Sequence, residues 1–296
     1  MSTAEVTARP AEPVARAPHA PGPVRAWLRL LGSELRLVFR RLRNLAMLAA
    51  LAVLPVLLGI ALRLTAPRGG GGPNSSFVDQ LAGNGVFLAF IALTFMITLP
   101  LPMVVAVVSG DSVAGEAGSG TLRYLLAVPA GRTRLLAVKY VTVVIFGLAS
   151  CSVVIGSALA TGAALFPLGP VTLLSGTTVS LGQGLLRVFF ITLFVAAAMA
   201  GLGAIGLAVS TFTEHPIGAI AAILFLTVVS DIADNIPQFA AVQPYLPTHW
   251  WQSFDALLRS PVAGSDLLHG LLSFGVYMVI FGSIAWARFT SADVTS

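Results

Sequence analysis

Residues 86–108 read VFLAFIALTFMITLPLPMVVAVV, a run of 23 residues without one charged side chain. An α-helix needs about 20 mainly apolar residues to cross the hydrocarbon core of a bilayer. A helix on the core of a soluble domain instead shows a polar face at a spacing of about 3.6 residues. The run has no such face, so it predicts a transmembrane helix.

Five further runs are similarly apolar, with charged residues only near their ends. They cover residues 45–64, 141–164, 188–209, 217–232 and 267–287. The run at 217–232 is short for a bilayer crossing, and we expect the outer segment that follows it, residues 233–266, to form short external helices. The sequence therefore predicts an all-α polytopic membrane protein with six transmembrane helices within residues 45–290.

The composition of the whole chain agrees with this prediction. Of the 296 residues, 56% are hydrophobic and 10% are charged, and the mean hydropathy is +0.90. A soluble domain carries about 25% charged residues, and a soluble fold of this size cannot bury so much apolar surface. The single cysteine, Cys151, excludes an internal disulfide, and no Cys/His spacing typical of a metal site occurs.

Two different segments precede the first run. Residues 1–23 are rich in Ala and Pro, and we expect a disordered tail that lacks the apolar centre of a signal peptide. Residues 24–44 predict an amphipathic interfacial helix, because arginines recur on one side and apolar residues on the other. The residues expected at the membrane surface are Arg25, Arg29, Arg36, Arg40 and Arg43. The alternative is a solvated helix of a soluble domain.

The placement of basic residues predicts the orientation. Eleven of them lie in segments 24–44 and 109–140 and at Arg288, against four in the connections on the other side. The positive-inside rule then makes both termini cytoplasmic, and we expect a multi-pass protein of a bacterial inner membrane. The net charge is +5, but the basic residues cluster at the ends of apolar runs. They therefore indicate contact with lipid headgroups and no nucleic acid.

Several kinds of catalytic site are missing from the sequence. No G-x-x-x-x-G-K-[ST] loop occurs, so ATP and magnesium have no site of that kind in this chain. No His stands where it could serve Ser152, Ser157 or Ser210 as the base of an intramembrane protease. No charged residue stands in the middle of a run, which disfavours an ion-coupled carrier. We therefore expect neither an enzyme nor a cofactor in the chain itself.

The most informative connection is residues 109–140, SGDSVAGEAGSGTLRYLLAVPAGRTRLLAVKY. We expect a cytoplasmic loop with a short helix over residues 121–128, ended by a Pro-Ala-Gly turn at 129–131. Leu122, Leu125 and Leu126 give this helix one apolar face. A short amphipathic helix parallel to the surface is typical of a docking element. The alternative is a plain amphipathic connector.

The order of residues in this loop resembles the permease subunits of type-two ABC exporters. That family carries an acid, then E-x-x-x-G-T-L-x-x-L-L-x-x-P, then a small residue with Arg, and then Lys. The matching positions are Asp111, Glu116, Gly120, Thr121, Leu122, Leu125, Leu126, Pro129, Gly131, Arg132 and Lys139. The layout of a basic surface helix followed by six spans is also similar.

The resemblance implies partners as well as a fold. In the family, two permease copies, here expected as a homodimer, assemble with two separate ABC ATPase subunits that bind ATP and magnesium. The loop between spans two and three contacts the ATPase. The ATPase-coupling residues implied here are Glu116, Gly120, Thr121, Leu122, Arg123, Leu125, Leu126, Pro129 and Arg132. Glu116 has an alternative role inside the permease, where it would fix the loop to the helix bundle.

The predicted function is the membrane-spanning permease subunit of an ATP-driven exporter that moves a hydrophobic or amphiphilic compound. The alternative is a non-transporting assembly or sensor subunit with the same fold. Two features depart from the family. The connection at 211–215 is too short for more than a minor second contact, and the outer segment at 233–266 is too short for a large external receptor domain.

Overall fold

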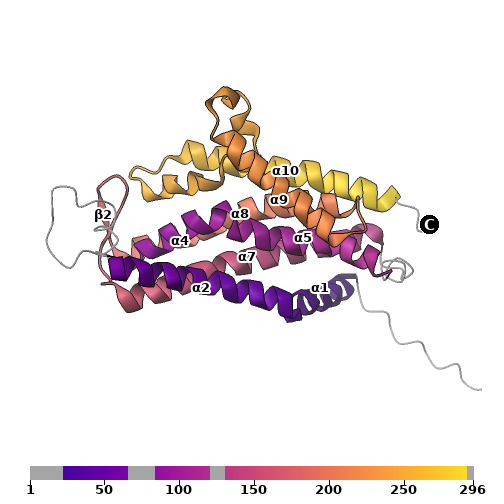
Figure 1. The fold of residues 1–296 in the computed structure, drawn as a ribbon, viewed down its shortest axis with the longest axis horizontal. Coiled ribbons are helices and arrows are strands. Elements are labelled where there is room, and N and C mark those ends of the chain that lie inside the picture. Colours follow the sequence, from indigo (N-terminus) through magenta and orange to yellow (C-terminus); the bar gives the residue numbers. More distant parts are fainter. Residues whose placement is uncertain (1–22, 66–83, 121–130, 292–296) are drawn as a thin grey trace, which may run out of the picture.

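Long helices that alternate in direction form one elongated bundle in the computed structural model, which describes residues 23–65, 84–120 and 131–291 (Figure 1). The helices are α1 (Pro23–Arg40), α2 (Leu42–Thr65), α4 (Phe87–Thr98), α5 (Pro100–Gly118), α7 (Arg132–Leu165), α8 (Leu181–Ser210), α9 (Pro216–Asp234) and α10 (Gly264–Ser291). The expected tail up to residue 22 and the expected short helix at 121–128 lie outside the described residues.

The number of membrane crossings agrees with the sequence. Among the described residues, α2, α7, α8, α9 and α10 are each long and apolar enough to span a bilayer, and α4 with α5 passes the same test as a bent pair. Counting that pair as one crossing gives six. The prediction of an all-α polytopic membrane protein is therefore confirmed. The start of α1 and the end of α10 lie at the same end of the bundle, as an even number of crossings requires (Figure 1).

The second crossing is broken near its middle. The axes of α4 and α5 meet at 50°, and Leu99 between them leaves the helical region with φ −142° and ψ −48°. Pro100 explains the break, because proline has no backbone N–H to donate and its ring pushes the preceding residue out of the helical conformation. The apolar run that predicts one straight helix is therefore two helices.

Two boundaries differ from the predicted ones. The interfacial helix ends at Arg40 and the first crossing begins at Leu42, so residues 42–44 belong to α2. The predicted loop at 109–140 is helical at both ends, because α5 continues to Gly118 and α7 already begins at Arg132. The polar residues after 108 lower the hydropathy, but they leave the helix intact, since Val113 and Ala114 remain buried in the bundle.

Helix α8 occupies the centre of the bundle, in contact with α5, α7, α9 and α10. Its second half has small residues that let neighbouring backbones approach, as is common between membrane helices. At Gly206 the approach is closest: a Cβ there would lie 1.9 Å from Ser109 Oγ and 2.7 Å from Ser109 Cβ. Ser109 is itself fully buried, and its hydroxyl donates to Val105 O at 2.7 Å.

Replacing Gly206 with alanine should therefore destabilise the bundle by about 1–3 kcal/mol, the usual range for an added group in a packed core. Thermal unfolding of the purified protein, followed by loss of the monodisperse chromatographic peak, measures this effect. Gly156→Ala is the matched control, because a Cβ at Gly156 meets nothing within 4 Å. Alanine in a helix is favoured over glycine, so the control should unfold at the same or a higher temperature. Equal midpoints for Gly206→Ala and the wild type would contradict the close packing.

The outside of the bundle is strongly apolar, as a membrane-embedded surface should be. Helices α2, α9 and α10 leave large side chains uncovered, among them Ile217, Phe225 and Val279, whose exposed fractions are 82%, 71% and 69%. A soluble protein rarely exposes continuous patches of this kind. These faces therefore fit contact with lipid tails or with another membrane protein.

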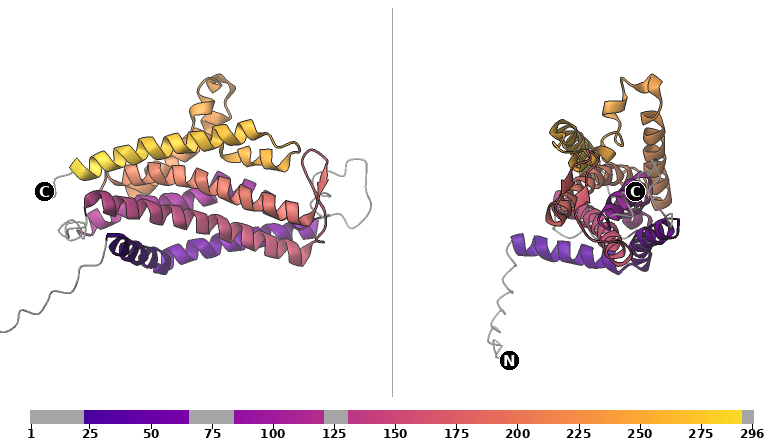
Figure 2. Two further views of the ribbon diagram at one scale, coloured as in Figure 1. Left: turned by 180° about the vertical axis from the view of Figure 1, so that it is seen from behind. Right: turned by 90° about the vertical axis from the view of Figure 1, so that its left-hand side faces the viewer.

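Helix α1 differs from the others in direction, since it runs sideways across one end of the bundle (Figure 2, right). The opposite end has a small hairpin, β1 (Val171–Thr172) paired antiparallel with β2 (Thr178–Val179). The predicted external helices of the outer segment are three 3-10 helices, η1 (Pro237–Phe239), η2 (Gln243–Tyr245) and η3 (Trp251–Leu258). The part with η1 and η2 projects beyond the neighbouring helices (Figures 1 and 2).

Candidate functional site

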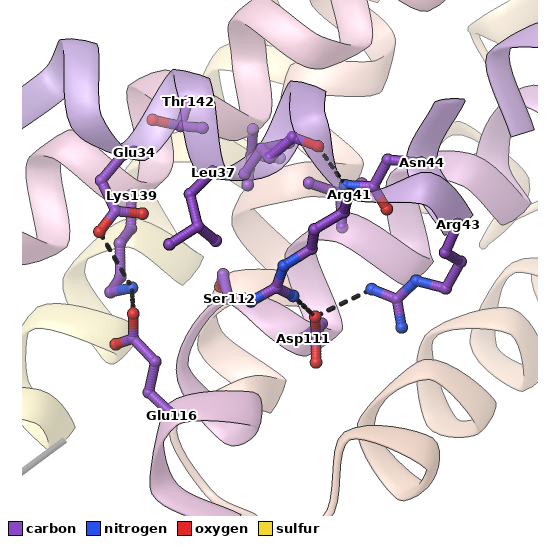
Figure 3. Close-up of a pocket in the computed structure, with 13 residues that line it drawn as sticks. Glu34, Leu37, Arg41, Arg43, Asn44, Asp111, Ser112, Glu116, Lys139 and Thr142 are labelled. Atoms are coloured by element: carbon purple, nitrogen blue, oxygen red, sulfur yellow. Dashed lines mark hydrogen bonds and ion pairs between the residues drawn. The ribbon is translucent and has the colours of Figure 1, made fainter. Parts of the chain in front are cut away.

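A buried lysine joins three helices at the end of the bundle where α1 lies. Lys139 Nζ, on the second turn of α7, lies 2.5 Å from Glu116 Oε1 on α5 and 3.8 Å from Glu34 Oε1 on α1 (Figure 3). The lysine side chain is only 2% exposed, and the two glutamates are largely covered. A buried charge is tolerated only when it is paired. The three side chains therefore hold α1, α5 and α7 together.

A second set of ion pairs lies one turn away on α5. Asp111 accepts hydrogen bonds from Arg41 and from Arg43, with Arg43 Nη2 at 2.9 Å from Asp111 Oδ2 (Figure 3). The carboxylate is 12% exposed, whereas nearly half of each arginine side chain is in solvent. Arg41 is the single residue between α1 and α2. Asp111 therefore fixes the corner at which the surface helix turns into the first crossing.

The same corner is secured by a buried amide. Asn44 Nδ2 donates to Val38 O at 2.8 Å, across the break between α1 and α2, and Asn44 N donates to Arg41 O at 3.0 Å. On α1 itself, Phe39 packs its ring 5.1 Å from that of Phe146 on α7. The apolar side of α1 therefore packs on the bundle, and polar contacts set its angle to α2.

The ion pairs described above involve six residues, which we call the charge cluster: Glu34, Arg41, Arg43, Asp111, Glu116 and Lys139.

The residues predicted for the membrane surface divide into two groups. Arg25, Arg29, Arg36 and Arg40 are exposed on α1, where they are free to meet headgroups. Arg43 belongs to α2 instead and pairs with Asp111. The prediction extends the helix past its real end, because nothing in the arginine spacing marks the break at residue 41.

The residues predicted for ATPase coupling are only partly within the described structure. Glu116 faces Lys139 inside the permease, in agreement with the alternative that Glu116 fixes the loop to the helix bundle. Gly120 has φ +68°, a left-handed conformation that glycine adopts without strain, and its N–H caps α5 by donating to Ala117 O at 3.0 Å. Arg132 donates to Thr290 O at 2.9 Å near the end of α10. The remaining positions, Thr121, Leu122, Arg123, Leu125, Leu126 and Pro129, lie outside the described residues.

Four members of the charge cluster were not predicted as site residues from the sequence, namely Glu34, Arg41, Asp111 and Lys139, although Asp111 and Lys139 match the family pattern. Glu34 offers one usable signal, because it is the only acidic residue in segment 24–44 and interrupts a basic helix. Lys139 offers another, as the only lysine of the chain. Both signals mark unusual residues but do not identify a partner, because the pairs join positions 23 to 105 residues apart.

The charge cluster is suited to linking helices rather than to binding a ligand. The cavity between its ion pairs has a volume of about 30 Å³, enough for a water molecule but far below the size of a nucleotide. In the described ranges no group of three or more His, Cys, Asp or Glu side chains is placed to hold a metal ion. The cluster connects both ends of the 119–131 connection, through α5 and α7, to the helix that crosses the end of the bundle.

A comparison with known families identifies the family of this chain. The sequence model described as "ABC-2 family transporter protein" matches residues 39–230, which is more than half of the chain. The match begins at the end of α1 and extends to α9, so it includes every member of the charge cluster except Glu34. A comparison with the curated proteins finds no match.

Proposed function

Because the chain belongs to the ABC-2 transporter family and is a membrane component of an ABC transporter, we propose that it is the permease subunit of an exporter powered by a separate ABC ATPase. Two copies of the chain and two ATPase subunits would make one transporter. ATP and magnesium would bind to the ATPase. The transported compound would be hydrophobic or amphiphilic. The bundle would lie in a bacterial inner membrane with both termini and the charge cluster on the cytoplasmic side.

The observation that carries this proposal is the charge cluster. An ATPase on the cytoplasmic side can act on the permease only through its cytoplasmic connections, and 119–131 is the longest one between crossings in this topology. The helices on either side of it, α5 and α7, meet at Lys139, and Lys139 also reaches Glu34 on α1. A push on this connection would therefore move α1, α5 and α7 as one body.

Such a movement would produce transport by alternating access. Closure of the ATPase pair around ATP would favour one of two packings of the permease halves, and hydrolysis would restore the other. The break at Leu99 and Pro100 supplies a place where the second crossing can bend. The exposed apolar faces of α2 and α9 supply surface for the second permease copy.

Co-purification with the cognate ATPase tests the proposal. We expect an affinity-tagged chain, expressed with its cognate ABC ATPase, to yield a complex with equal amounts of both subunits. In lipid nanodiscs this complex should hydrolyse ATP, and in sealed vesicles it should move a substrate in an ATP-dependent way. Purification of the chain without an ATPase would contradict the exporter. A complex that hydrolyses ATP but moves none of the compounds that stimulate hydrolysis would favour the assembly or sensor subunit instead.

A further inference from the structure

A cavity of about 400 Å³ lies at the end of the bundle opposite the charge cluster. Its walls are the first turns of α4, the turn of the β1–β2 hairpin and the 3-10 helix η3. Cavities that hold small molecules usually measure about 300–1,000 Å³ and combine an apolar lining with a few polar groups. This cavity has both properties, and it is more than ten times as large as the space within the charge cluster.

One side of the cavity is aromatic. Phe87 and Phe90 on α4 contribute rings whose centroids are 5.9 Å apart in an edge-to-face arrangement, and Phe254 on η3 stands with them in the lining. All three side chains are at least 96% buried, so their positions are set by packing. Rings of this kind favour a flat or bulky apolar group.

The other side of the cavity is polar and carries one permanent charge. The lining there includes Gln252, Ser253 and Asp255 on η3. Among the described residues, Asp255 pairs only with Arg259, four residues on, at 3.0 Å, and its side chain remains 44% exposed. His249 also lines the cavity, but its Nδ1 lies 2.5 Å from Asp234 Oδ1, which balances any positive charge on that ring. The lining therefore favours a positively charged group over a negatively charged one.

The polar wall is held in place by contacts away from the cavity. Leu174 N donates to Leu258 O at 2.9 Å, which fastens the hairpin to η3. The guanidinium of Arg187 on α8 donates to Leu257 O and, at 3.0 Å, to Arg259 O. A site whose walls are already ordered binds a ligand with a smaller loss of conformational freedom. The cavity is thus a preformed space rather than a gap between loose loops.

We propose that this cavity binds a small amphiphilic cation, with its apolar body against Phe87, Phe90 and Phe254 and its positive charge toward Asp255. The assignment of the bound cation as a transported compound rests on the proposed function, whereas binding itself does not. In the proposed orientation the cavity lies on the outer side, where a compound would leave the exporter.

Binding of tetraphenylphosphonium tests this inference, with tetraphenylborate as a probe of the same shape and opposite charge. The full chain, together with its ATPase where the two co-purify, is placed in phosphatidylcholine nanodiscs without ATP, and binding is measured by equilibrium dialysis. Ser253→Phe places a ring in the cavity and leaves less room for the ligand, and we define site binding as the part that this variant loses. We expect at least tenfold weaker binding of the cation to Ser253→Phe and little site binding of the anion.

Two further variants separate the charge of Asp255 from its ion pair. Asp255→Asn should weaken cation binding about fivefold, as expected for one partly exposed charge. Arg259→Gln removes the same ion pair but keeps the carboxylate, so it should bind the cation as well as the wild type or better. These two variants keep the test decisive even where Ser253→Phe does not fold, because their total cation binding is compared directly with that of the wild type. Both should fold, since exposed ion pairs of this kind contribute little to stability.

Equal site binding of cation and anion, or equal losses in Asp255→Asn and Arg259→Gln, would overturn the inference. The proposed function is judged separately, by whether the ATPase co-purifies. A complex that retains its ATPase but shows no site binding refutes the proposed cation site and leaves the proposed function unaffected. A chain that recruits no ATPase but binds the cation with the expected pattern refutes the exporter and supports the cavity.

Discussion

Replacing Lys139 with methionine should lower the free energy of unfolding by about 3 kcal/mol, the usual result of removing one partner from a buried ion pair. Methionine preserves most of the volume of the side chain, so the effect comes from charge. Without the ammonium group, the carboxylates of Glu34 and Glu116 face each other across the end of the bundle with no counter-charge between them. Thermal unfolding of purified protein, followed by loss of the monodisperse peak, measures the change.

A neutral variant separates the pairing from the space that the side chains fill. In the triple variant Glu34→Gln, Glu116→Gln, Lys139→Met, no uncompensated charge remains, and replacement of a whole buried ion group by neutral residues is often nearly neutral for stability. We expect the triple variant to regain most of the stability lost in Lys139→Met. Equal instability in the two variants would show that the charges of these residues do not hold the helices together.

The same triple variant tests transmission. If the charge cluster passes the movement of the ATPase to the permease, a stable triple variant should still bind the ATPase but no longer link hydrolysis to transport. Normal transport by this variant would assign the cluster a structural role only. Stability and coupling are thus measured on one set of proteins, which avoids confusing an unfolded permease with an uncoupled one.

The crossings of this protein could be predicted from the sequence because each run is apolar on all sides. Hydropathy reports the surroundings of a residue but not the direction of the chain. Residues 86–108 stay apolar through Leu99 and Pro100, so the 50° break leaves no trace in the hydropathy profile. The proline itself was the available signal, since it disfavours a helical conformation in the residue before it.

Only part of the candidate site could be predicted from the sequence. The loop pattern included Asp111, Glu116 and Lys139, but it did not show which residues each of them pairs with. Arg41 precedes Asp111 by 70 residues, and Lys139 follows Glu116 by 23. Such pairings depend on how the helices pack, and no local spacing encodes them. For the same reason, the ion pair of Arg43 with Asp111 could not be predicted from the sequence.

The outer cavity could not be predicted from the sequence at all. Phe87 and Phe90 read as ordinary members of a transmembrane run, and Asp255 reads as a solvated residue of an outer connection. They line one space only because η3 is fastened to the hairpin and to Arg187, more than 65 residues earlier in the chain. A site built from separate elements in this way is visible only in the folded protein.

Leu126→Asp should abolish association with the ATPase while the permease still inserts in the membrane. Residues 121–130 lie outside the described structure, so this prediction rests on the sequence, where the spacing of Leu122, Leu125 and Leu126 predicts one shared face of a short helix. Truncation of a buried apolar anchor at an interface typically costs about 2 kcal/mol or more, and a buried carboxylate adds its own desolvation. Pull-down of the ATPase from detergent-solubilised membranes, with equal amounts of permease, measures the loss.

Two companion variants show whether that loss is specific to an interface. Arg123→Glu reverses a charge that we expect at the rim, so it should weaken association less than Leu126→Asp does. Glu116→Gln changes a residue that faces Lys139 within the permease, so it should retain the ATPase but reduce transport-linked hydrolysis. Because Glu116 lies just before the connection and Leu126 within it, the two variants separate contact with the ATPase from transmission of its movement. Wild-type binding and coupling in Leu126→Asp would exclude this connection as the ATPase contact, and the exporter would then need another route for its energy.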